Sequence, residues 1–495
     1  MGIYSLADYD ADARSQINNS SHQSKRERAP MSFSLPTVQF DPTLLRKYDQ
    51  PVPRYTSYPP ATELKTEFDQ VDFRAGIAVG NYKKTPLSLY CHIPFCETPC
   101  YFCGCNTVIT QRKEFAIPYL DYTVRHIRQM AELIDNQRPV DQMHWGGGTP
   151  NYLSLDQVER LWMTINEHFR FAPDAEVSIE VNPRYLDRNY VLFLKDLGFN
   201  RISFGIQDFN PQVQEAVNRI QPEALLFNVM EWIREAGFES VNVDLIYGLP
   251  FQTLSTYRET INKTIQLDPD RIAVFNFAYV PWLKPVQRLI PQEALPKPSE
   301  KLDILQMAIE QLGQNGYQFI GMDHFAKPND ELAIAQRQGQ LHRNFQGYTT
   351  KPESDLIGFG MTSISMLHDV YVQNHKRLKD FYQALDRGIL PIERGVRLNQ
   401  DDVIRRTAIM ELMCQYQLSK DDFEEKYHLS FDQDFDEYFA AERYELKQLE
   451  ADGLIRLFHN CIQVTPAGRL LIRNIAAVFD TYLRQKIMSN FSKAI

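Results

Sequence analysis

Between residues 87 and 279 the chain alternates short strand-like runs with longer helical patterns, and this rhythm limits the fold more than any other feature. Strands that alternate with helices pair in parallel through right-handed crossovers, as in an α/β layer or an α/β barrel. One of the helices is opened by the capping box Ser154-x-x-Gln157. The strands are predicted at residues 87–93, 142–146, 176–181, 201–207, 240–248 and 271–279.

Polar and apolar residues alternate inside these strands, although buried parallel strands are usually apolar throughout. In the run 176–181, for example, apolar residues alternate with Ser178 and Glu180. A flat sheet covered by helices on both sides would bury such carboxylates at a cost of several kcal/mol each. A barrel with a polar lumen avoids this cost, and its site would lie at the carboxyl ends of the strands, where Glu180, Gln207 and Asp244 fall. An antiparallel sheet with one solvated face is the alternative, which the long segments between the strands disfavour.

The sequence divides into three predicted regions. Residues 1–40 form a flexible N-terminal tail, because this stretch is polar, mixed in charge and without periodicity. Residues 41–370 comprise an arm rich in proline and aromatic residues, followed by the barrel, whose six predicted strands are too few to close it. Residues 371–495 form a mostly helical domain that covers the site. Its last helix, ribbon and helix also fit a DNA-binding winged helix, but the lack of a basic face favours a packing or lid domain.

Length, charge and apolar content narrow the class of protein. A chain of 495 residues exceeds what one compact core usually serves. No apolar run is long enough to cross a bilayer, and the first residues do not resemble a signal peptide, so we expect a cytoplasmic protein without a membrane span. The net charge of −10 argues against nucleic acid as a partner but allows a small anionic substrate held by a few arginines.

Five of the seven cysteines lie between residues 91 and 105. Downstream of Cys91 they are spaced Cys96-x-x-x-Cys100-x-x-Cys103-x-Cys105. Disulfides are disfavoured in the cytoplasm, and a structural zinc site would need a second, separated cysteine pair. The remaining interpretation is an iron–sulfur cluster in which three thiolates leave one iron open to a ligand that is not protein.

A glycine-rich turn, "GGGTP" (146–150), follows the second predicted strand. Its glycines let backbone N–H groups approach a ligand closely. Without the cysteines, an ordinary strand-to-helix turn would explain these residues equally well.

The cysteine spacing at the end of the first strand, with Phe102 directly before Cys103, resembles that of the radical S-adenosylmethionine enzymes. Nearly the whole chain from Leu44 to Ile495 further resembles one family, the oxygen-independent coproporphyrinogen III oxidases. The stretches that carry this likeness are "PRYTSYP" (53–59), "YCHIPFC" (90–96), "CYFCGCN" (100–106), "GFNRISFGIQDFN" (198–210), "VDLIYGLP" (243–250), "YQFIGMDHFAKPNDELA" (317–333), "LHRNFQGYTT" (341–350) and "GRLLIRNI" (468–475). Cys105 and "HRNFQGYTT" distinguish the oxidases from their closest relatives, haem chaperones on the same fold that lack this last cysteine.

The resemblance implies an α/β fold, an incomplete (β/α)6 radical-SAM barrel, and a set of cofactor-binding residues. One [4Fe-4S] cluster would be held by Cys96, Cys100 and Cys103, and two S-adenosylmethionine molecules would bind beside it. The residues that match the first are Tyr90, Gly147, Glu180 and Ile364. Those that match the second are Phe102, Gly148, Thr149, Gln207, Arg219, Asp244 and Ala278. Cys105 and Tyr90 are the candidate catalytic residues.

Some of these positions also have ordinary structural explanations. Taken singly, Arg219 fits a solvated helix position and Ile364 a core position. Cys91 is expected to pack on the strand face rather than bind metal. Asn182 stands where the oxidases more often have Asp, and Asn at this position is a weak resemblance to the haem chaperones.

The implied reaction is an oxidative decarboxylation in haem biosynthesis. A 5′-deoxyadenosyl radical would take a hydrogen from the β-carbon of a propionate, and loss of carbon dioxide and one electron would leave a vinyl group. Two such events would convert coproporphyrinogen III into protoporphyrinogen IX, with an electron donor and an electron acceptor that the sequence does not identify. The substrate carboxylates call for arginine partners, and Arg54, Arg184 and Arg343 lie in family-like motifs. The alternative is a haem chaperone without oxidase activity, and in either case a monomer is expected.

Overall fold

The computed structural model describes residues 38–351, 354–429 and 434–484. The predicted tail, residues 1–40, therefore lies outside the described residues up to position 37. None of the described helices combines the length and the apolar character that a membrane crossing needs.

All six strands predicted between residues 87 and 279 are present. They pair in parallel, each beside the next in chain order, which confirms the predicted incomplete (β/α)6 barrel. The strands are β1 (Leu87–Ile93), β4 (Pro139–Gly147), β5 (Arg170–Val181), β6 (Arg201–Gln207), β7 (Ser240–Tyr247) and β8 (Arg271–Asn276).

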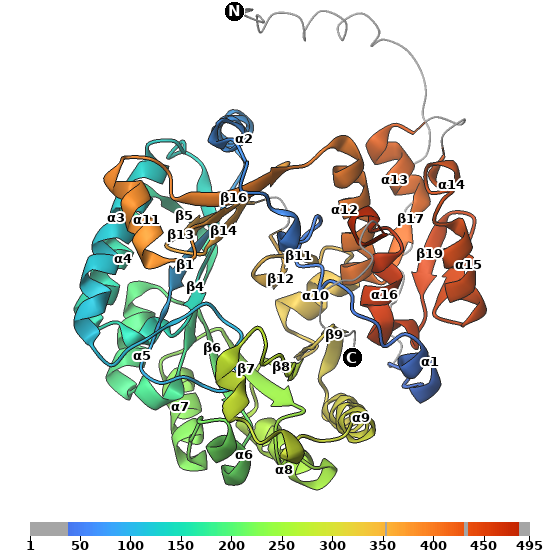
Figure 1. Ribbon diagram of the computed structural model, residues 1–495, viewed down its shortest axis with the longest axis horizontal. Helices are drawn as coiled ribbons and strands as arrows, with labels where there is room; N and C mark the ends of the chain where they lie inside the picture. Colours follow the sequence, from blue (N-terminus) through green and yellow to red (C-terminus); the bar gives the residue numbers. More distant parts are fainter. Residues whose placement is uncertain (1–37, 352–353, 430–433, 485–495) are drawn as a thin grey trace, which may run out of the picture. The chain divides into compact units, whose positions relative to one another are not determined.

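The helices that follow these strands form an outer row around them (Figure 1). They are α3 (Ala116–Ala131), α4 (Leu155–His168), α5 (Arg188–Leu197), α6 (Pro211–Ala216), α7 (Glu223–Glu235), α8 (Leu254–Leu267) and α9 (Pro298–Gln314). The capping box predicted at the start of α4 is formed, since Ser154 Oγ accepts from the Gln157 N–H and the Gln157 side chain accepts from the Ser154 N–H.

The sheet continues beyond the predicted strands at both ends, to a total of twelve among the described residues. Next to β1 lies a further parallel strand, β13 (Asp355–Phe359), followed by the antiparallel strands β14 (Ile364–Met366), β15 (Val370–Asn374) and β16 (Ile392–Arg397). Next to β8 lie the antiparallel strands β10 (His324–Ala326) and β9 (Gln318–Gly321). The division of the chain at about residue 370 stays a prediction, and the sheet itself runs on to Arg397.

Both outer edges of this sheet are hydrogen-bonded by other segments. At β16, the backbone of Lys65 exchanges two hydrogen bonds with Gly395, at 2.8 and 2.9 Å. At β9, the carbonyl of Ile320 accepts from the side-chain amide of Gln336, at 2.6 Å, and from the hydroxyl of Tyr416, at 3.1 Å. Gln336 belongs to α10 (Glu331–Arg337).

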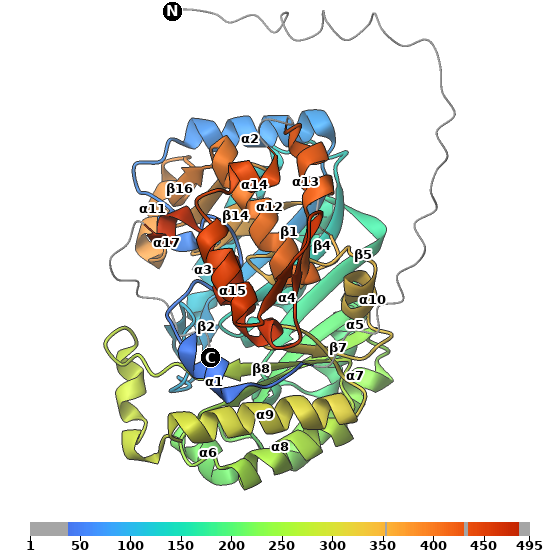
Figure 2. The ribbon, with the colours of Figure 1, turned by 90° about the vertical axis from the view of Figure 1, so that its right-hand side faces the viewer.

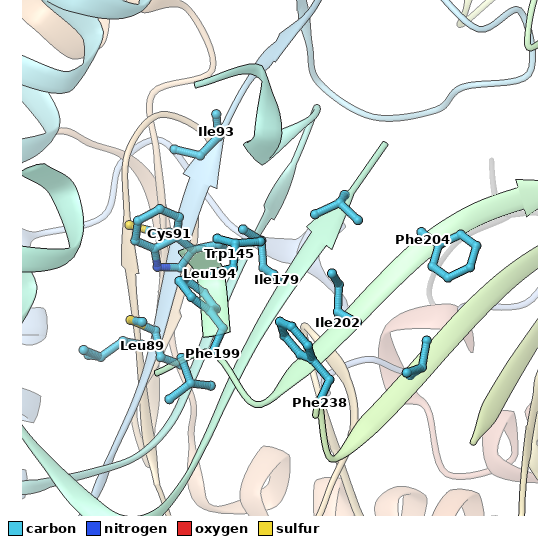
Figure 3. Close-up of a cluster of buried hydrophobic side chains, with 14 of the residues drawn as sticks. Leu89, Cys91, Ile93, Trp145, Ile179, Leu194, Phe199, Ile202, Phe204 and Phe238 are labelled. Carbon is cyan, nitrogen blue, oxygen red and sulfur yellow. The ribbon is translucent and has the colours of Figure 1, made fainter. Parts of the chain in front are cut away.

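The apolar faces of the parallel strands pack against the outer helices. Figure 3 shows Cys91 of β1 beside Trp145 of β4, with Leu194 of α5 and Phe199 among the neighbouring core side chains. The Cys91 side chain is 1% exposed and belongs to this hydrophobic cluster, which confirms that it packs on the strand face. The opposite, polar face of the strands is therefore turned away from the helices.

Ion pairs occupy the polar face where the strands begin. Arg201, the first residue of β6, contacts Glu176 of β5 at 3.6 Å and Glu331 at 2.6 Å. Arg271, the first residue of β8, contacts Asp330 at 2.8 Å and Glu331 at 2.7 Å. The start of α10 is thereby attached to the amino ends of the strands, and these charges satisfy one another.

The segments on either side of the barrel pack together. The arm comprises α1 (Pro42–Lys47) and α2 (Gln70–Lys83). The C-terminal domain consists of α12 (Gln400–Gln415), α13 (Lys420–Tyr427), α14 (Phe435–Tyr438), α15 (Arg443–Ala451), α16 (Ile472–Ala477), α17 (Thr481–Arg484) and a small sheet of β17 (Gln417–Ser419), β18 (Ile455–Leu457) and β19 (Cys461–Val464). Figure 2 shows the helices α12 to α15 of this mostly helical domain. Tyr55 of the arm donates to Asp480 at 2.9 Å, and Arg473 donates to the carbonyl of Pro53 at 3.1 Å.

Candidate active site

The cysteine loop leaves the carboxyl end of β1 and is held at both ends. It runs between the two-residue strands β2 (Phe95–Cys96) and β3 (Val108–Ile109), which pair in parallel. Its middle is attached to the turn after α6: the Tyr101 N–H donates to the carbonyl of Val217 at 3.0 Å, and the Asn218 side chain donates to the carbonyl of Pro99 at 2.7 Å. The loop therefore has a defined place at the carboxyl ends of the strands, as a barrel site requires.

Polar groups face two of the sulfur atoms. Cys96 Sγ lies 3.3 Å from the hydroxyl of Thr149, and Cys103 Sγ accepts from the Cys105 N–H at 3.4 Å. Among the residues that the structure describes, no three His, Cys, Asp or Glu side chains lie close enough to hold a single metal ion. The Cys105 N–H favours thiolate over thiol at Cys103. Burial raises the pKa of the Cys96 thiol to about 11, against the opposing effect of the Thr149 hydroxyl.

Two guanidinium groups face the third sulfur. Arg219 Nη1 lies 3.6 Å from Cys100 Sγ, and Arg184 Nη2 lies 3.8 Å from it. Arg184 is itself held by Asn182, whose Oδ1 accepts from its backbone N–H at 3.2 Å and from its Nε at 3.3 Å. Two cations on one sulfur fit a cysteine that works as a thiolate, which is what ligation of an iron–sulfur cluster requires.

A cavity of about 300 Å³ opens beside this loop, at the carboxyl ends of β1, β4 and β5. It is lined by Tyr90, His92, Cys105, Asn106, Gly147, Glu180, Thr362, Gln373 and Lys376. Three of the four residues predicted for the first S-adenosylmethionine are therefore together in one cavity. The fourth, Ile364, is not among its lining residues but pairs in register with Gln373 on the neighbouring strand. Cys105, predicted as catalytic, is exposed and shares this cavity with Tyr90.

His144 connects the polar side chains of three strands. Its ring stacks on that of Tyr90, with centroids 5.9 Å apart. Its Nδ1 lies 2.7 Å from the hydroxyl of Ser178, and its Nε2 lies 3.3 Å from a carboxylate oxygen of Glu180. The imidazole therefore fixes the orientation of both Tyr90 and Glu180.

The surroundings determine the charge states around the cavity. Burial, together with the Glu180 carboxylate, raises the pKa of the Tyr90 phenol well above its usual value. Burial also lowers the pKa of His92 to about 4, so that its ring is neutral at pH 7. Burial acts to raise the pKa of Glu180, but His144 and the Gly147 N–H outweigh it and hold this pKa below its usual value. The cavity thus presents one carboxylate and the amino group of Lys376 among uncharged hydrogen-bonding groups.

The glycine turn after β4 leaves no room for larger residues. Gly147 has φ +117°, its N–H donates to Glu180 at 3.3 Å, and an added Cβ would lie 2.6 Å from the ring of His92. At Gly148 an added Cβ would lie 2.6 Å from the carbonyl oxygen of Pro94. Both positions therefore require glycine for the turn to pack against β1 and β5.

The residues predicted for the second S-adenosylmethionine lie farther along the row of strand ends. Arg219, 8% exposed, joins Cys100 to the carbonyl of Gly205, to which its Nη2 donates at 3.2 Å. Gln207 has φ +69° in a bulge of β6, and its buried Oε1 has no hydrogen-bond partner in the structure. A strained residue with an unused acceptor fits a ligand site. Burial and the Glu180 carboxylate raise the pKa of Asp244 to about 7.

The other residues of the second set are less closely connected. Gly148 and Thr149 belong to the glycine turn, and Thr149 contacts Cys96. Phe102 packs against an apolar cluster that includes Ile246. Ala278 is exposed in the segment after β8.

Several side chains at the site were not singled out from the sequence. His144 and His92 alternate with apolar residues on the polar faces of β4 and β1, so the alternation that revealed Glu180 could have revealed them too. Thr362 reaches the cavity from the segment after β13, Gln373 from β15 and Lys376 from the segment after β15. No signal in the sequence places β13 beside β1 or β15 in the same sheet.

Comparison with known proteins gives consistent matches over most of the chain. The Radical SAM superfamily model matches residues 90–264, and the HemN C-terminal domain model matches residues 398–471. The chain is 66% identical over 466 residues to the oxygen-independent coproporphyrinogen III oxidase of Synechocystis sp., which covers 94% of this chain and 100% of that protein. It is 48% identical over 464 residues to the Escherichia coli enzyme of the same name, covering 94% and 100%. A solved structure of coproporphyrinogen III oxidase (HemN) from Escherichia coli, described as a radical SAM enzyme, superimposes with a TM-score of 0.86 at 47% identity, covering 90% of this chain and 100% of that one.

Proposed function

Because the chain belongs to the family of oxygen-independent coproporphyrinogen III oxidases, we propose that it converts two propionates of coproporphyrinogen III into vinyl groups, yielding protoporphyrinogen IX. The observation that carries this proposal is the joint placement of the cysteine loop, two cysteine-facing arginines and a polar cavity at one end of the barrel. For each vinyl group formed, the substrate loses one hydrogen atom, one carbon dioxide and one electron.

The radical SAM family implies a [4Fe-4S] cluster and S-adenosylmethionine as cofactors. When bound, they supply a one-electron cleavage of the sulfonium that produces a 5′-deoxyadenosyl radical. We propose that Cys96, Cys100 and Cys103 hold the cluster. The N–H, O–H and guanidinium groups that face their sulfurs support this assignment.

We propose that the cavity binds the first S-adenosylmethionine. The Glu180 carboxylate, held by His144 and the Gly147 N–H, is suited to accept hydrogen bonds from an ammonium group. Tyr90 stays neutral, since burial raises the pKa of its phenol, and its hydroxyl lies 3.0 Å from Nδ1 of His92, which lines the same cavity. Ile364 would contribute an apolar contact from the neighbouring strand.

We further propose that the protein binds a second S-adenosylmethionine. Phe102, Gly148, Thr149, Gln207, Arg219, Asp244 and Ala278 would bind it. The unused acceptor of Gln207 and the elevated pKa of Asp244 support a polar ligand at this place. Equilibrium binding to the reconstituted protein would test the stoichiometry, with two molecules per chain expected and one molecule contradicting it.

The covering segments complete the proposed arrangement. The C-terminal domain from about residue 371 and the arm would exclude water while the substrate radical exists. The proposal leaves the electron donor and acceptor unnamed, and takes the protein as a cytoplasmic monomer, where the loop thiols stay reduced.

The direct test is anaerobic. The cluster is reconstituted, reductant, S-adenosylmethionine and coproporphyrinogen III are added, and protoporphyrinogen, 5′-deoxyadenosine and methionine are followed by chromatography. Vinyl product together with cofactor cleavage is expected. Cofactor binding without vinyl product, together with tight haem binding, would instead favour the chaperone function. Cys105 and the "HRNFQGYTT" stretch argue against that function.

Cys105 has a proposed role of its own, as a relay of protons or electrons at the site. Its position on the wall of the cavity shared with Tyr90 supports this. The variant Cys105→Ser is expected to keep the cluster and lose vinyl formation. Full vinyl formation by a variant with an intact cluster would contradict the role.

A further inference from the structure

Three arginines in family-like motifs are candidates to meet the substrate carboxylates, and the structure separates them. Arg54 forms an ion pair with Asp323. Arg184 is directed at Cys100 Sγ. Arg343, in β11 (His342–Asn344), is 7% exposed, and its Nε and Nη1 have no hydrogen-bond partner in the structure. Of the three, only Arg343 has buried guanidinium nitrogens without a hydrogen-bond partner among the described residues.

An unpartnered guanidinium is not expected in a protein interior without a reason. Buried charges are normally paired, and each buried donor without an acceptor calls for an explanation. The same hairpin carries a second such donor, because the buried Nε2 of Gln346 also has no partner. Two side chains of one hairpin thus offer unused donors, which is the arrangement that an acceptor-only ligand such as a carboxylate needs.

Aromatic rings connect Arg343 to the barrel. Its guanidinium lies over the ring of Tyr348, 4.7 Å from the centroid, on the paired strand β12 (Gly347–Thr349). Tyr348 packs edge-on against His324 of β10, with centroids 5.4 Å apart, and His324 packs in the same way against Phe275 of β8, at 6.0 Å. The buried Nδ1 of His324 has no partner either. The rings hold the cation in place without neutralising it.

The strand register places this group beside the proposed cofactor residues. Asp244 of β7 is paired with Ala273 of β8, and Ala273 is paired with His324 of β10. Residues directly paired across a sheet point to the same face, so His324 shares the polar face with Asp244. Neighbouring strands are about 4.8 Å apart, so the Cα atoms of these two residues are roughly 10 Å apart.

We propose that Arg343, backed by Tyr348 and flanked by His324 and Gln346, binds a carboxylate of the tetrapyrrole substrate. This inference rests on the proposed function and adds to it the residue that anchors the substrate. The planar guanidinium can give two parallel hydrogen bonds to one carboxylate, which an ammonium group cannot do. A propionate held there would direct the macrocycle across the polar face toward Asp244.

The test measures binding separately from catalysis. Coproporphyrin III, the fluorescent oxidised form of the substrate, is titrated into reconstituted wild type, Arg343→Gln and Arg343→Lys. Because Arg343→Gln loses hydrogen bonds to a charged group, it should bind about tenfold to a hundredfold more weakly than wild type. Arg343→Lys should lie in between. The control is Arg188→Gln. It removes an exposed arginine of the outer helix α5, which pairs with Glu235 of α7, and this variant is expected to bind as wild type does.

Stability distinguishes a binding role from a structural one. If Arg343 serves the ligand, replacing it relieves an unpaired buried cation, so Arg343→Gln without porphyrin is expected to melt at the wild-type temperature or above it. Porphyrin binding equal to that of wild type, or a melting temperature lowered by several degrees, would overturn the inference.

The test also distinguishes this inference from the proposed function. A wild type that binds coproporphyrin III through Arg343 but forms no vinyl product would refute the oxidase activity and leave the anchor standing. An active wild type whose Arg343→Gln variant keeps the same KM would refute the anchor alone. Inorganic phosphate is the competing probe, and displacement of the porphyrin at equal concentrations would overturn the assignment in favour of a general anion site.

Discussion

Removing the guanidinium of Arg184 should make the iron–sulfur cluster harder to reduce. Arg184 Nη2 lies 3.8 Å from Cys100 Sγ, on the sulfur that Arg219 also faces at 3.6 Å. Hydrogen bonds and positive charge at cluster sulfurs stabilise the reduced cluster, because reduction adds a negative charge. Arg184 is the better target of the two, since Arg219 is itself proposed to bind a cofactor.

The size of the effect follows from Coulomb's law. Two unit charges about 4 Å apart interact by about 4 kcal/mol at an effective dielectric constant of about 20. The added electron spreads over the whole cluster, whose centre is farther from the guanidinium, so roughly a third to a half of this value remains, or about 1–2 kcal/mol. For a one-electron couple, 1.4 kcal/mol corresponds to about 59 mV. The midpoint potential of Arg184→Gln should therefore lie about 40–80 mV below that of wild type.

The assay is a redox titration of the reconstituted protein without S-adenosylmethionine, followed by the paramagnetic resonance of the reduced cluster. Asn182→Asp should shift the midpoint in the same direction by a smaller amount, because a carboxylate would then face the Arg184 Nε. Arg188→Gln should leave it unchanged. A midpoint of Arg184→Gln within about 10 mV of wild type, at equal iron and sulfide content, would refute the reasoning.

Three further predictions concern the turn, the pH dependence and a buried ion pair. Gly148→Ala should weaken S-adenosylmethionine binding by about tenfold or more, measured by equilibrium binding, because its Cβ would meet a backbone oxygen at 2.6 Å. Gly104→Ala, in open space, should not change it. Burial raises the pKa of Asp208 to about 6, so the folded state keeps a proton that the unfolded state releases. As the pH rises from about 4 to about 6, wild type should lose roughly 2 kcal/mol of unfolding free energy relative to Asp208→Asn, and a constant difference in urea titrations would contradict this. Arg138→Met leaves the Asp355 carboxylate, now paired at 2.5 Å, buried alone, and should cost about 3–5 kcal/mol in urea unfolding, whereas a loss under about 1 kcal/mol would contradict it.

The part of the fold that the sequence predicts is the part with a periodic signal. The bounds of β1 and β6 match the prediction because each strand alternates between the helix-facing and polar sides. The strand β13 was not predicted, since all five of its residues are buried and no alternation marks it. Its parallel partner β1 is more than two hundred residues away along the chain, and no local pattern records such a pairing.

The candidate site likewise contains residues that the sequence predicts and residues whose roles it cannot separate. The cysteine spacing and the polar strand faces predict Cys96, Glu180 and Asp244 as candidate site residues. The sequence could not separate Arg54 from Arg343, because the difference lies in their partners: Asp323 pairs with the first, and none of the described residues accepts from Nε and Nη1 of the second. Such differences arise only when segments that are distant along the chain pack together.

The two hydrogen-bonded edges of the sheet have a consequence for the folding of the newly made chain. A barrel that does not close keeps two outer strands whose free backbone groups can template pairing with other chains. One edge is occupied by Lys65, which precedes the barrel, and the other by the side chains of Gln336 and Tyr416, which follow its parallel strands. A newly made barrel is thus open to aggregation until its flanking segments have docked. We therefore expect a truncation that removes those segments but spares every cofactor residue to expose the sheet edges and to self-associate.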